Sequence, residues 1–243
     1  MLYVVATPIG NLGDITLRAL ETLRKVSVIA CEDTRETLKL LRHYDLGKKE
    51  LIGYHNFNER QASEKILARL EQGEEIALVS DAGTPALSDP GFYLVRAAFE
   101  RGIKVVPIVG ASALTAAISV CPLPVNRFYF EGFLPHKKGR QSRLRFLASQ
   151  SLEAIIFYES PHRLLRLLEE LQTYFGDARA MVARELTKLH EEIVVGTLSE
   201  LKATFSSKKI LGELVVVLSP IKPSEHSHDS STNEEDEHSY TDY

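Results

Sequence analysis

The sequence has no tryptophan and only two cysteines among its 243 residues. Cys31 and Cys121 are too few for a disulfide framework or a zinc cluster, and each is expected to be a thiol of the hydrophobic core. Long hydrophobic runs are also missing. Runs such as 154–158 and 214–218 have only five residues, whereas a membrane-spanning helix needs about 20. No basic residue precedes Arg18 and the first apolar run is too short for a signal peptide, so we expect a cytosolic protein without a membrane partner.

Positive charge is absent from the end of the chain. Residues 223–243 contain seven acidic residues and no lysine or arginine. This segment has almost no apolar side chains to offset the entropy of its own ordering, so we predict a disordered acidic tail. Its three histidines are expected to be solvated, and we expect no metal site. Residues 1–222 carry 29 basic and 26 acidic residues, and this mildly basic body permits a polyanionic partner.

The rest of the composition is that of a folded α/β protein. Hydrophobic residues make up 44% and charged residues 26% of the chain, which is typical of a soluble globular protein. Short β-branched runs alternate with helical patterns along residues 2–218, which indicates a parallel sheet covered by helices. The last predicted strands lie close in sequence, so the second sheet is expected to be mixed. Glycine and proline at 110–124 mark the boundary between an N-terminal domain (1–112) and a C-terminal domain (113–222).

Polar, turn-rich loops follow the predicted strands, where ligands bind in open α/β sheets. Residues 6–16 (ATPIGNLGDIT) contain two glycines, which allow a ligand to approach the backbone closely. Either Asp14 or Thr16 is expected to cap the helix that follows. Their spacing fits neither GxGxxG nor GxxxxGK[ST]. Residues 80–91 (SDAGTPALSDPG) contain two aspartates, two glycines and two prolines. Loops of this kind commonly carry function, and Asp81 is expected to accept hydrogen bonds from a ligand.

Charged loops follow other strands. Residues 31–35 (CEDTR) fit an N-cap at Asp33 with a first-turn ion pair, or a carboxylate and a guanidinium presented to a ligand, and the cap is favoured. Residues 158–163 (YESPHR) predict a helix that is capped at Ser160. Residues 183–192 (ARELTKLHEE) gather charged side chains between two strands, and their spacing excludes the HExxH zinc motif.

Basic and aromatic residues are interleaved over residues 128–146. The predicted helix at 137–149 carries five basic side chains, and four aromatic residues precede it. Such a pattern suits RNA, because basic groups bind phosphates and rings stack on unpaired bases. A solvated basic helix face explains the pattern equally well, and the residues alone leave both explanations open.

These motifs occur in one order across residues 3–217: VATPIGNLGDIT, CEDTR, YHNFNE, SDAGTPALSDPG, GFLPHKKGR, FYESPHR, ARELTKLHEE and GELVVV. Together they closely resemble the bacterial 16S ribosomal RNA 2′-O-ribose methyltransferase I family, within the tetrapyrrole-methylase-like superfamily. The resemblance implies two α/β domains with a cleft between them, S-adenosyl-L-methionine as cofactor, and a homodimer. It also implies a target cytidine in the decoding centre, in free 16S rRNA or in the small ribosomal subunit. Many members continue beyond GELVVV with a basic helical segment, whereas this chain turns acidic.

The resemblance also implies which residues form the site. The cofactor pocket is expected to be lined by Pro8, Ser80, Asp81, Ala82, Gly83, Thr84, Pro85, Ser112, Ala113, Tyr158, Glu159, Leu211 and Gly212. Backbone groups hold much of the cofactor in this superfamily, which fits loops rich in glycine, alanine and proline. The basic side chains expected to bind RNA phosphates are Arg35, Lys137, Lys138, Arg140, Arg143 and Arg184.

Methyl transfer to a ribose requires in-line attack by a hydroxyl that is hardly ionised at neutral pH. A lysine or carboxylate near the acceptor would assist its deprotonation, and we nominate Lys188 and Glu185, with Asp33 next. Two alternatives stay open. One is a small-molecule, tetrapyrrole-type methyltransferase of the same fold, and the other is a non-catalytic RNA-binding factor in ribosome assembly. Cofactor binding separates both enzymes from the last alternative, and the acceptor separates the two enzymes from each other.

Overall fold

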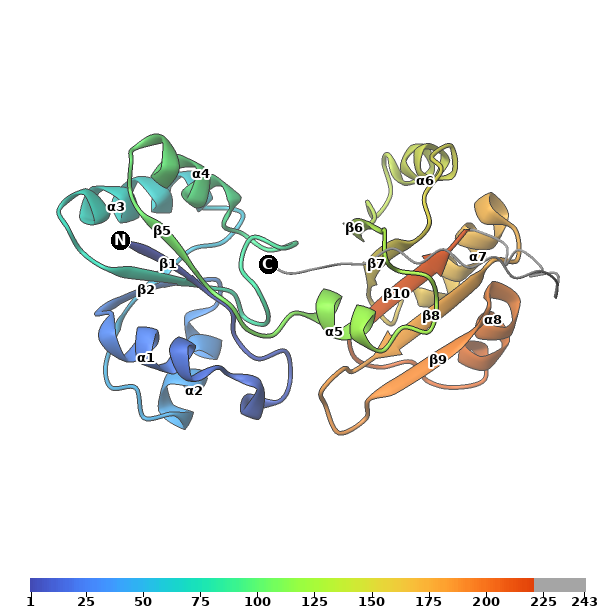
Figure 1. Cartoon of the computed structure of the whole chain (residues 1–243), viewed down its shortest axis with the longest axis horizontal. Helices are drawn as coiled ribbons and strands as arrows, with labels where there is room; N and C mark the ends of the chain where they lie inside the picture. The colour runs from blue at the N-terminus through green and yellow to red at the C-terminus, as the bar shows by residue number, and fades with distance from the viewer. Residues whose placement is uncertain (221–243) are drawn as a thin grey trace, which may run out of the picture.

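The computed structural model describes residues 1–220, and the predicted acidic tail at 223–243 lies outside them. The first half of the chain forms a sheet of five parallel strands, as predicted (Figure 1). In spatial order they are β3 (Glu50–Gly53), β2 (Val28–Cys31), β4 (Ile76–Val79), β1 (Leu2–Val5) and β5 (Val105–Ile108). Because β5 is an edge strand, it tolerates the missing backbone N–H of Pro107.

Helices cover both faces of this sheet, as strands that are apolar on both faces require. One face is covered by α1 (Leu17–Lys25) and α2 (Thr34–His43), and the other by α3 (Glu59–Glu71) and α4 (Phe92–Glu100) (Figure 1). Successive side chains of a strand point to opposite faces. Ile29 therefore packs into the core beneath α1 and α2, and Ala30 into the core beneath α3 and α4.

The starts of several helices follow local side-chain chemistry. Thr16 Oγ1 accepts a hydrogen bond from the Ala19 N–H at 3.1 Å, and the Asp33 carboxylate accepts one from Arg35 N–H at 2.8 Å. Both caps were among the predicted ones. The prediction for α7 (Leu164–Phe175) was wrong at its start, because Ser160 is not its cap. Residues 160–163 form a turn instead, closed by a hydrogen bond from the Arg163 N–H to the Ser160 carbonyl at 3.0 Å.

The second half of the chain forms a mixed sheet, which confirms the prediction. In spatial order its strands are β6 (Tyr129–Phe133), β7 (Ile155–Glu159), β10 (Leu214–Ser219), β8 (Arg179–Arg184) and β9 (Glu192–Thr197). Only β6 and β7 are parallel to each other. One face packs against α6 (Arg140–Ala148), α7 and α8 (Leu198–Ser206).

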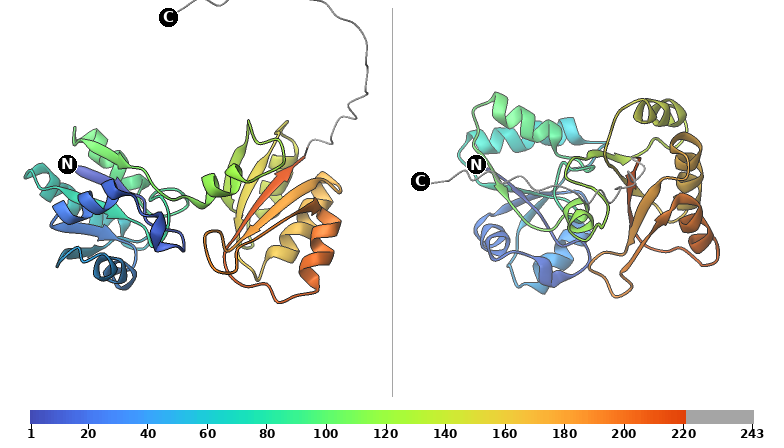
Figure 2. Two further views of the ribbon diagram at one scale, coloured as in Figure 1. Left: turned by 60° about the horizontal axis from the view of Figure 1, so that its bottom comes forward. Right: turned by 45° about the vertical axis from the view of Figure 1, so that its right-hand side comes forward.

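The other face of the mixed sheet is directed toward the first half of the chain. It packs against α5 (Ala113–Ser119), and also against Ile9 and Leu87 from the N-terminal loops. The chain crosses between the two sheets in the short segment from β5 to α5 (Figure 2). Loops after the N-terminal strands thereby meet the C-terminal sheet.

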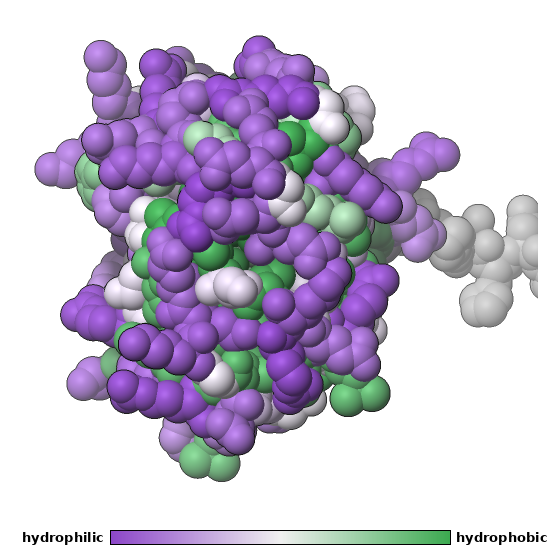
Figure 3. All heavy atoms as spheres, turned by 90° about the vertical axis from the view of Figure 1, so that its left-hand side faces the viewer, coloured by the Kyte–Doolittle hydropathy of each residue, from purple (hydrophilic) through white to green (hydrophobic). Residues whose placement is uncertain are grey.

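Polar side chains cover most of the outer end of the N-terminal half, with apolar atoms visible between them (Figure 3). Within residues 1–220, no helix has the length and apolar character needed to cross a membrane.

Candidate active site

A pocket of about 350 Å³ lies between the two halves of the chain. Its N-terminal wall is made by Ile9, Glu32, residues 81–84 and residues 112–113, which follow β1, β2, β4 and β5. The opposite wall comes from the mixed sheet and includes Tyr158 and Leu214. The pocket thus occupies the carboxyl edge of the parallel sheet, where ligands bind in open α/β folds.

The loop after β4 is held tightly at this edge. The Thr7 N–H donates to the Gly83 carbonyl at 2.9 Å, and the Gly83 N–H donates to the Thr7 carbonyl at 3.0 Å. Gly83 has a φ of +83°, and a side chain there would also press on Ile9. Ala86 and Ser88 have φ values of +67° and +68°, a strained conformation for side-chain-bearing residues that is concentrated at functional sites. The loop therefore presents a rigid backbone surface to the pocket.

Three carboxyl groups on the N-terminal side of the pocket lack a basic ion-pair partner within residues 1–220: Glu32, Asp81 and Asp89. Burial is the main cause of a raised pKa at each of them. The pKa of Asp89 reaches about 6, because the nearby Glu32 charge adds to the effect of burial. Asp81 Oδ1 also accepts a hydrogen bond from the Asp33 N–H at 2.9 Å. This wall of the pocket carries uncompensated negative charge at neutral pH.

Lys188 and Glu185 form an ion pair at the edge of the pocket. Lys188 Nζ lies 2.9 Å from Glu185 Oε1 and 2.9 Å from Glu213 Oε2. Two glycines make room for the pair, because a Cβ at Gly10 would overlap the Lys188 side chain and a Cβ at Gly212 would overlap Glu185. Lys188 from the β8–β9 loop is therefore seated on the loop after β1, and it ties the two halves of the chain together.

The pKa values of the three predicted catalytic residues make them poor proton acceptors at neutral pH. Burial opposes the charge of Lys188, but its hydrogen bonds to Glu185 and Glu213 outweigh burial and raise its pKa. Burial likewise opposes the charge of Glu185, yet the Lys188 and Glu213 hydrogen bonds lower its pKa. Hydrogen bonds from Arg35 lower the pKa of Asp33 to about 2. At neutral pH Lys188 is protonated, and both carboxylates are weak bases.

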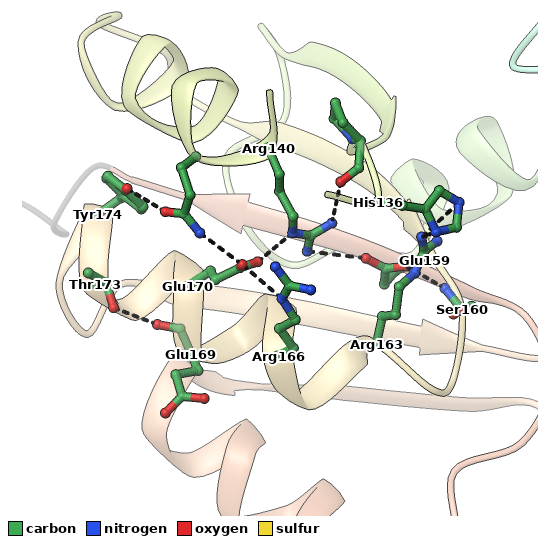
Figure 4. A network of polar contacts seen from close by, with 12 residues as sticks. His136, Arg140, Glu159, Ser160, Arg163, Arg166, Glu169, Glu170, Thr173 and Tyr174 are labelled. Atoms are coloured by element: carbon green, nitrogen blue, oxygen red, sulfur yellow. Dashed lines mark hydrogen bonds and ion pairs between the residues drawn. The ribbon is translucent and has the colours of Figure 1, made fainter. Parts of the chain in front are cut away.

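Behind the pocket lies a buried network of ion pairs (Figure 4). The Glu159 carboxylate lines the pocket and lies 2.7 Å from Arg163 Nε and 3.5 Å from an Arg140 terminal nitrogen. Arg140 Nε also lies 2.6 Å from Glu170. The side chains of Arg140 and Glu159 are each only 1% exposed. The expectation that Arg140 binds RNA phosphates is therefore wrong, because its guanidinium is inside the domain and neutralises buried carboxylates.

The other predicted RNA-binding side chains divide into two groups. Arg143 is bound to Glu131, and Arg184 to Glu192, so the charges of both are largely satisfied within the chain. Lys137 and Lys138 are exposed and form no ion pair within the described residues. Arg35 is also exposed, although it contacts Asp33.

Most of the residues expected to bind the cofactor meet in this pocket. It is lined by Asp81, Ala82, Gly83, Thr84, Ser112, Ala113, Tyr158, Glu159 and Gly212. Pro8 and Ser80 line an adjoining hollow, and Pro85 and Leu211 line neither. The sequence reasoning missed Asp89, Phe133, Leu186 and Glu213, which also line the pocket. For Asp89 the signal was present, since it belongs to the loop at 80–91.

Residues 1–202 match the family model of the tetrapyrrole (corrin/porphyrin) methylases. The chain belongs to this family. Within it, the chain is 49% identical over 239 residues to the ribosomal RNA small subunit methyltransferase I of Synechocystis sp., covering 98% of this chain and 85% of that protein. It is 47% identical over 218 residues to the Thermotoga maritima protein of the same name, covering 90% of this chain and 97% of that protein. The chain is thus a member of the small-subunit methyltransferase I group.

Solved structures share the fold at lower sequence identity. Diphthine synthase superimposes with a TM-score of 0.68 at 18% identity, covering 90% of this chain and 89% of that chain. Uroporphyrin-III C-methyltransferase from Thermus thermophilus, solved in complex with S-adenosyl homocysteine, superimposes with a TM-score of 0.63 at 17% identity. That match covers 90% of this chain and 96% of the other. The predicted tetrapyrrole-methylase-like fold is confirmed.

Proposed function

We propose that this chain is a cytoplasmic enzyme that methylates small-subunit ribosomal RNA with S-adenosyl-L-methionine. The observation that carries the proposal is the identity of nearly one half to small-subunit methyltransferases I over almost the whole chain. A structural neighbour solved with S-adenosyl homocysteine supports the choice of cofactor. The finer target implied by the motifs, the 2′-hydroxyl of a cytidine in the decoding centre, is part of the same proposal.

The residues of the pocket fit such a cofactor. Its volume of about 350 Å³ lies within the usual range for small-ligand sites. Gly83 and Gly212 line the pocket with backbone atoms alone, and the carboxylates of Glu32 and Asp81 suit a ligand with positive charge. When bound, S-adenosyl-L-methionine supplies a methyl group on a positively charged sulfur, which is an electrophile. The chain supplies the alignment of the reactants and the exclusion of water.

We assign the role of proton acceptor to Asp89 in preference to the three residues that the sequence suggested. It lines the pocket, it has no ion-pair partner within the described residues, and its pKa of about 6 is near that of an efficient general base. Lys188 and Glu185 instead position the β8–β9 loop on the loop after β1. The neutral Asp89→Asn variant removes the proton acceptor while keeping the shape of the side chain.

The direct test combines the purified chain, methyl-labelled S-adenosyl-L-methionine and small ribosomal subunits lacking this methylation, followed by nucleoside analysis. We expect label in 2′-O-methylcytidine from the wild type, and a loss of about 100-fold in rate for Asp89→Asn with the cofactor still bound. Cofactor binding without transfer to RNA would favour the small-molecule alternative. RNA binding without cofactor binding would favour the non-catalytic assembly factor.

The homodimer implied by the motifs also stays a proposal. Phe92, Phe99 and Val109 on the N-terminal half are each about two-thirds exposed, and apolar side chains of this size are available for a subunit contact. Light scattering on the purified chain tests this, and a monomer at micromolar concentration would reject the dimer.

A further inference from the structure

A second hollow, of about 370 Å³, adjoins the cofactor pocket. The two spaces are adjacent, because they share four lining residues: Ile9, Asp81, Ala82 and Glu213. The second hollow extends over the side of α2, and Lys188 lies at its border.

The wall of this hollow is apolar in one part and charged in another. Pro8, Leu12 and Leu40 supply apolar surface, and Glu36 and Lys39 supply opposite charges at the opening. A nucleotide has the matching chemistry, because a base has apolar faces and polar edges and its phosphate is an anion. Lys39 contacts Glu36 at 2.6 Å, but the lysine side chain is 70% exposed. Such surface pairs contribute little, so Lys39 is available to a phosphate.

The helix that borders the hollow carries a row of cations. Arg35, Lys39 and Arg42 are spaced by four and three residues on α2, which places them on one side of the helix. All three are exposed. The Arg35 guanidinium is held by Asp33 in a pair whose arginine side chain is 84% exposed, and Arg42 forms no ion pair within residues 1–220. One row of cations leading from a hollow is suited to successive phosphates of one strand.

The geometry of methyl transfer determines where the acceptor lies. The attacking oxygen and the methyl carbon have to come within about 3–3.5 Å in a reactive arrangement, so the acceptor must occupy a space that adjoins the cofactor pocket. The hollow over α2 adjoins the cofactor pocket, because the two spaces share four lining residues. Lys188 lines this hollow, and its ion pairs with Glu185 and Glu213 hold its side chain in place there.

We propose that the hollow over α2 is the acceptor pocket. It takes one unstacked nucleotide of the RNA strand, with the base against Leu12 and Leu40 and the flanking phosphates along Arg35, Lys39 and Arg42. This inference rests on the proposed function, since it names the place of the acceptor in the same reaction. It moves the main RNA contact from the basic helix α6, where Arg140 is buried, to α2.

Filling the hollow tests its role. Leu12 is 39% exposed at the rim, so Leu12→Trp places a bulky ring there without entering the core. Leu17→Trp is the matched control, because Leu17 is 78% exposed on α1 and lines neither space. We expect Leu12→Trp to keep its melting temperature and its cofactor affinity by calorimetry, and to lose about tenfold or more in kcat/KM for small subunits. An equal loss of cofactor affinity would assign the hollow to the cofactor, and unchanged kcat/KM would also overturn the proposal.

Removing two cations tests the row on α2 independently. In Lys39→Ala with Arg42→Ala, the salt dependence of RNA binding should flatten by about 0.7 for each lost phosphate contact. Lys65→Ala with Lys104→Ala removes the same charge away from both spaces and should leave the slope unchanged. Equal slopes in both double variants would overturn the proposal. If the wild type itself transferred no methyl group to subunits, the proposed function would fail, while this binding assay would still report on the row.

Discussion

Replacing Arg140 by methionine probes the network behind the pocket. Methionine fills much of the space of the arginine stem, but it leaves the buried Glu159 carboxylate with Arg163 as its remaining basic partner. Breaking a buried pair by removing one partner costs about 3–5 kcal/mol. Because Arg163 lies at 2.7 Å from Glu159 and the Ser160 N–H donates to it at 2.8 Å, we expect the lower end, about 3 kcal/mol.

Thermal unfolding measures this loss. For a chain of this size, 1 kcal/mol corresponds to about 2–4 °C, so Arg140→Met should lower the melting temperature by about 6–12 °C. Arg145→Met is the matched control, because Arg145 is an exposed residue of the same helix, and it should change stability by less than about 0.5 kcal/mol. Cofactor affinity should also fall in Arg140→Met, because Glu159 lines the pocket.

A second substitution separates loss of charge pairing from loss of packing. Adding Glu159→Gln to Arg140→Met removes the unpaired charge and should recover about 1–2 kcal/mol of the stability. The reasoning would be refuted if Arg140→Met unfolded at the same temperature as Arg145→Met. It would also fail if the double variant were less stable than Arg140→Met alone.

Three further variants test other parts of the molecule. Gly83→Val forces a β-branched side chain to a φ of +83° beside Ile9. Calorimetry should therefore show cofactor binding that is at least about tenfold weaker. A folded variant with unchanged cofactor affinity would exclude this loop from the cofactor site. Burial raises the pKa of Asp89 to about 6, so its ionisation destabilises the folded state as the pH rises from about 4 to about 6. The stability of Asp89→Asn relative to the wild type should therefore increase over this range, by about 1–2 kcal/mol at pH 8. Parallel curves of melting temperature against pH for the two proteins would contradict this. Replacing Lys137 and Lys138 together by alanine should reduce the slope of log affinity for RNA against log salt concentration by up to about 1.4. An unchanged slope would show that the two lysines do not contact RNA phosphates.

Local sequence determined the elements and much of their order. The predicted cap at Asp33 is confirmed, and the helix that it begins, α2, runs from Thr34 to His43. The predicted mixed second sheet was also correct, but the last two strands, whose closeness in sequence suggested it, do not pair with each other. The antiparallel pairs are β8 with β9, and β10 with both β8 and β7. Helix caps and hydrophobic periodicity depend on residues that are close together in the chain, so they can be recognised in a single sequence.

Burial and pairing were decided only by the tertiary structure. Around Arg140 the sequence is strongly basic, and nothing local shows that Glu159 and Glu170 will lie beside its guanidinium. Lys188 is seated on Gly10, which is far away in the chain, and Asp89 owes its raised pKa to burial and to the Glu32 charge from another loop. Charge, accessibility and pKa depend on which distant segments pack together, because desolvation and Coulomb interactions act through space and not along the chain.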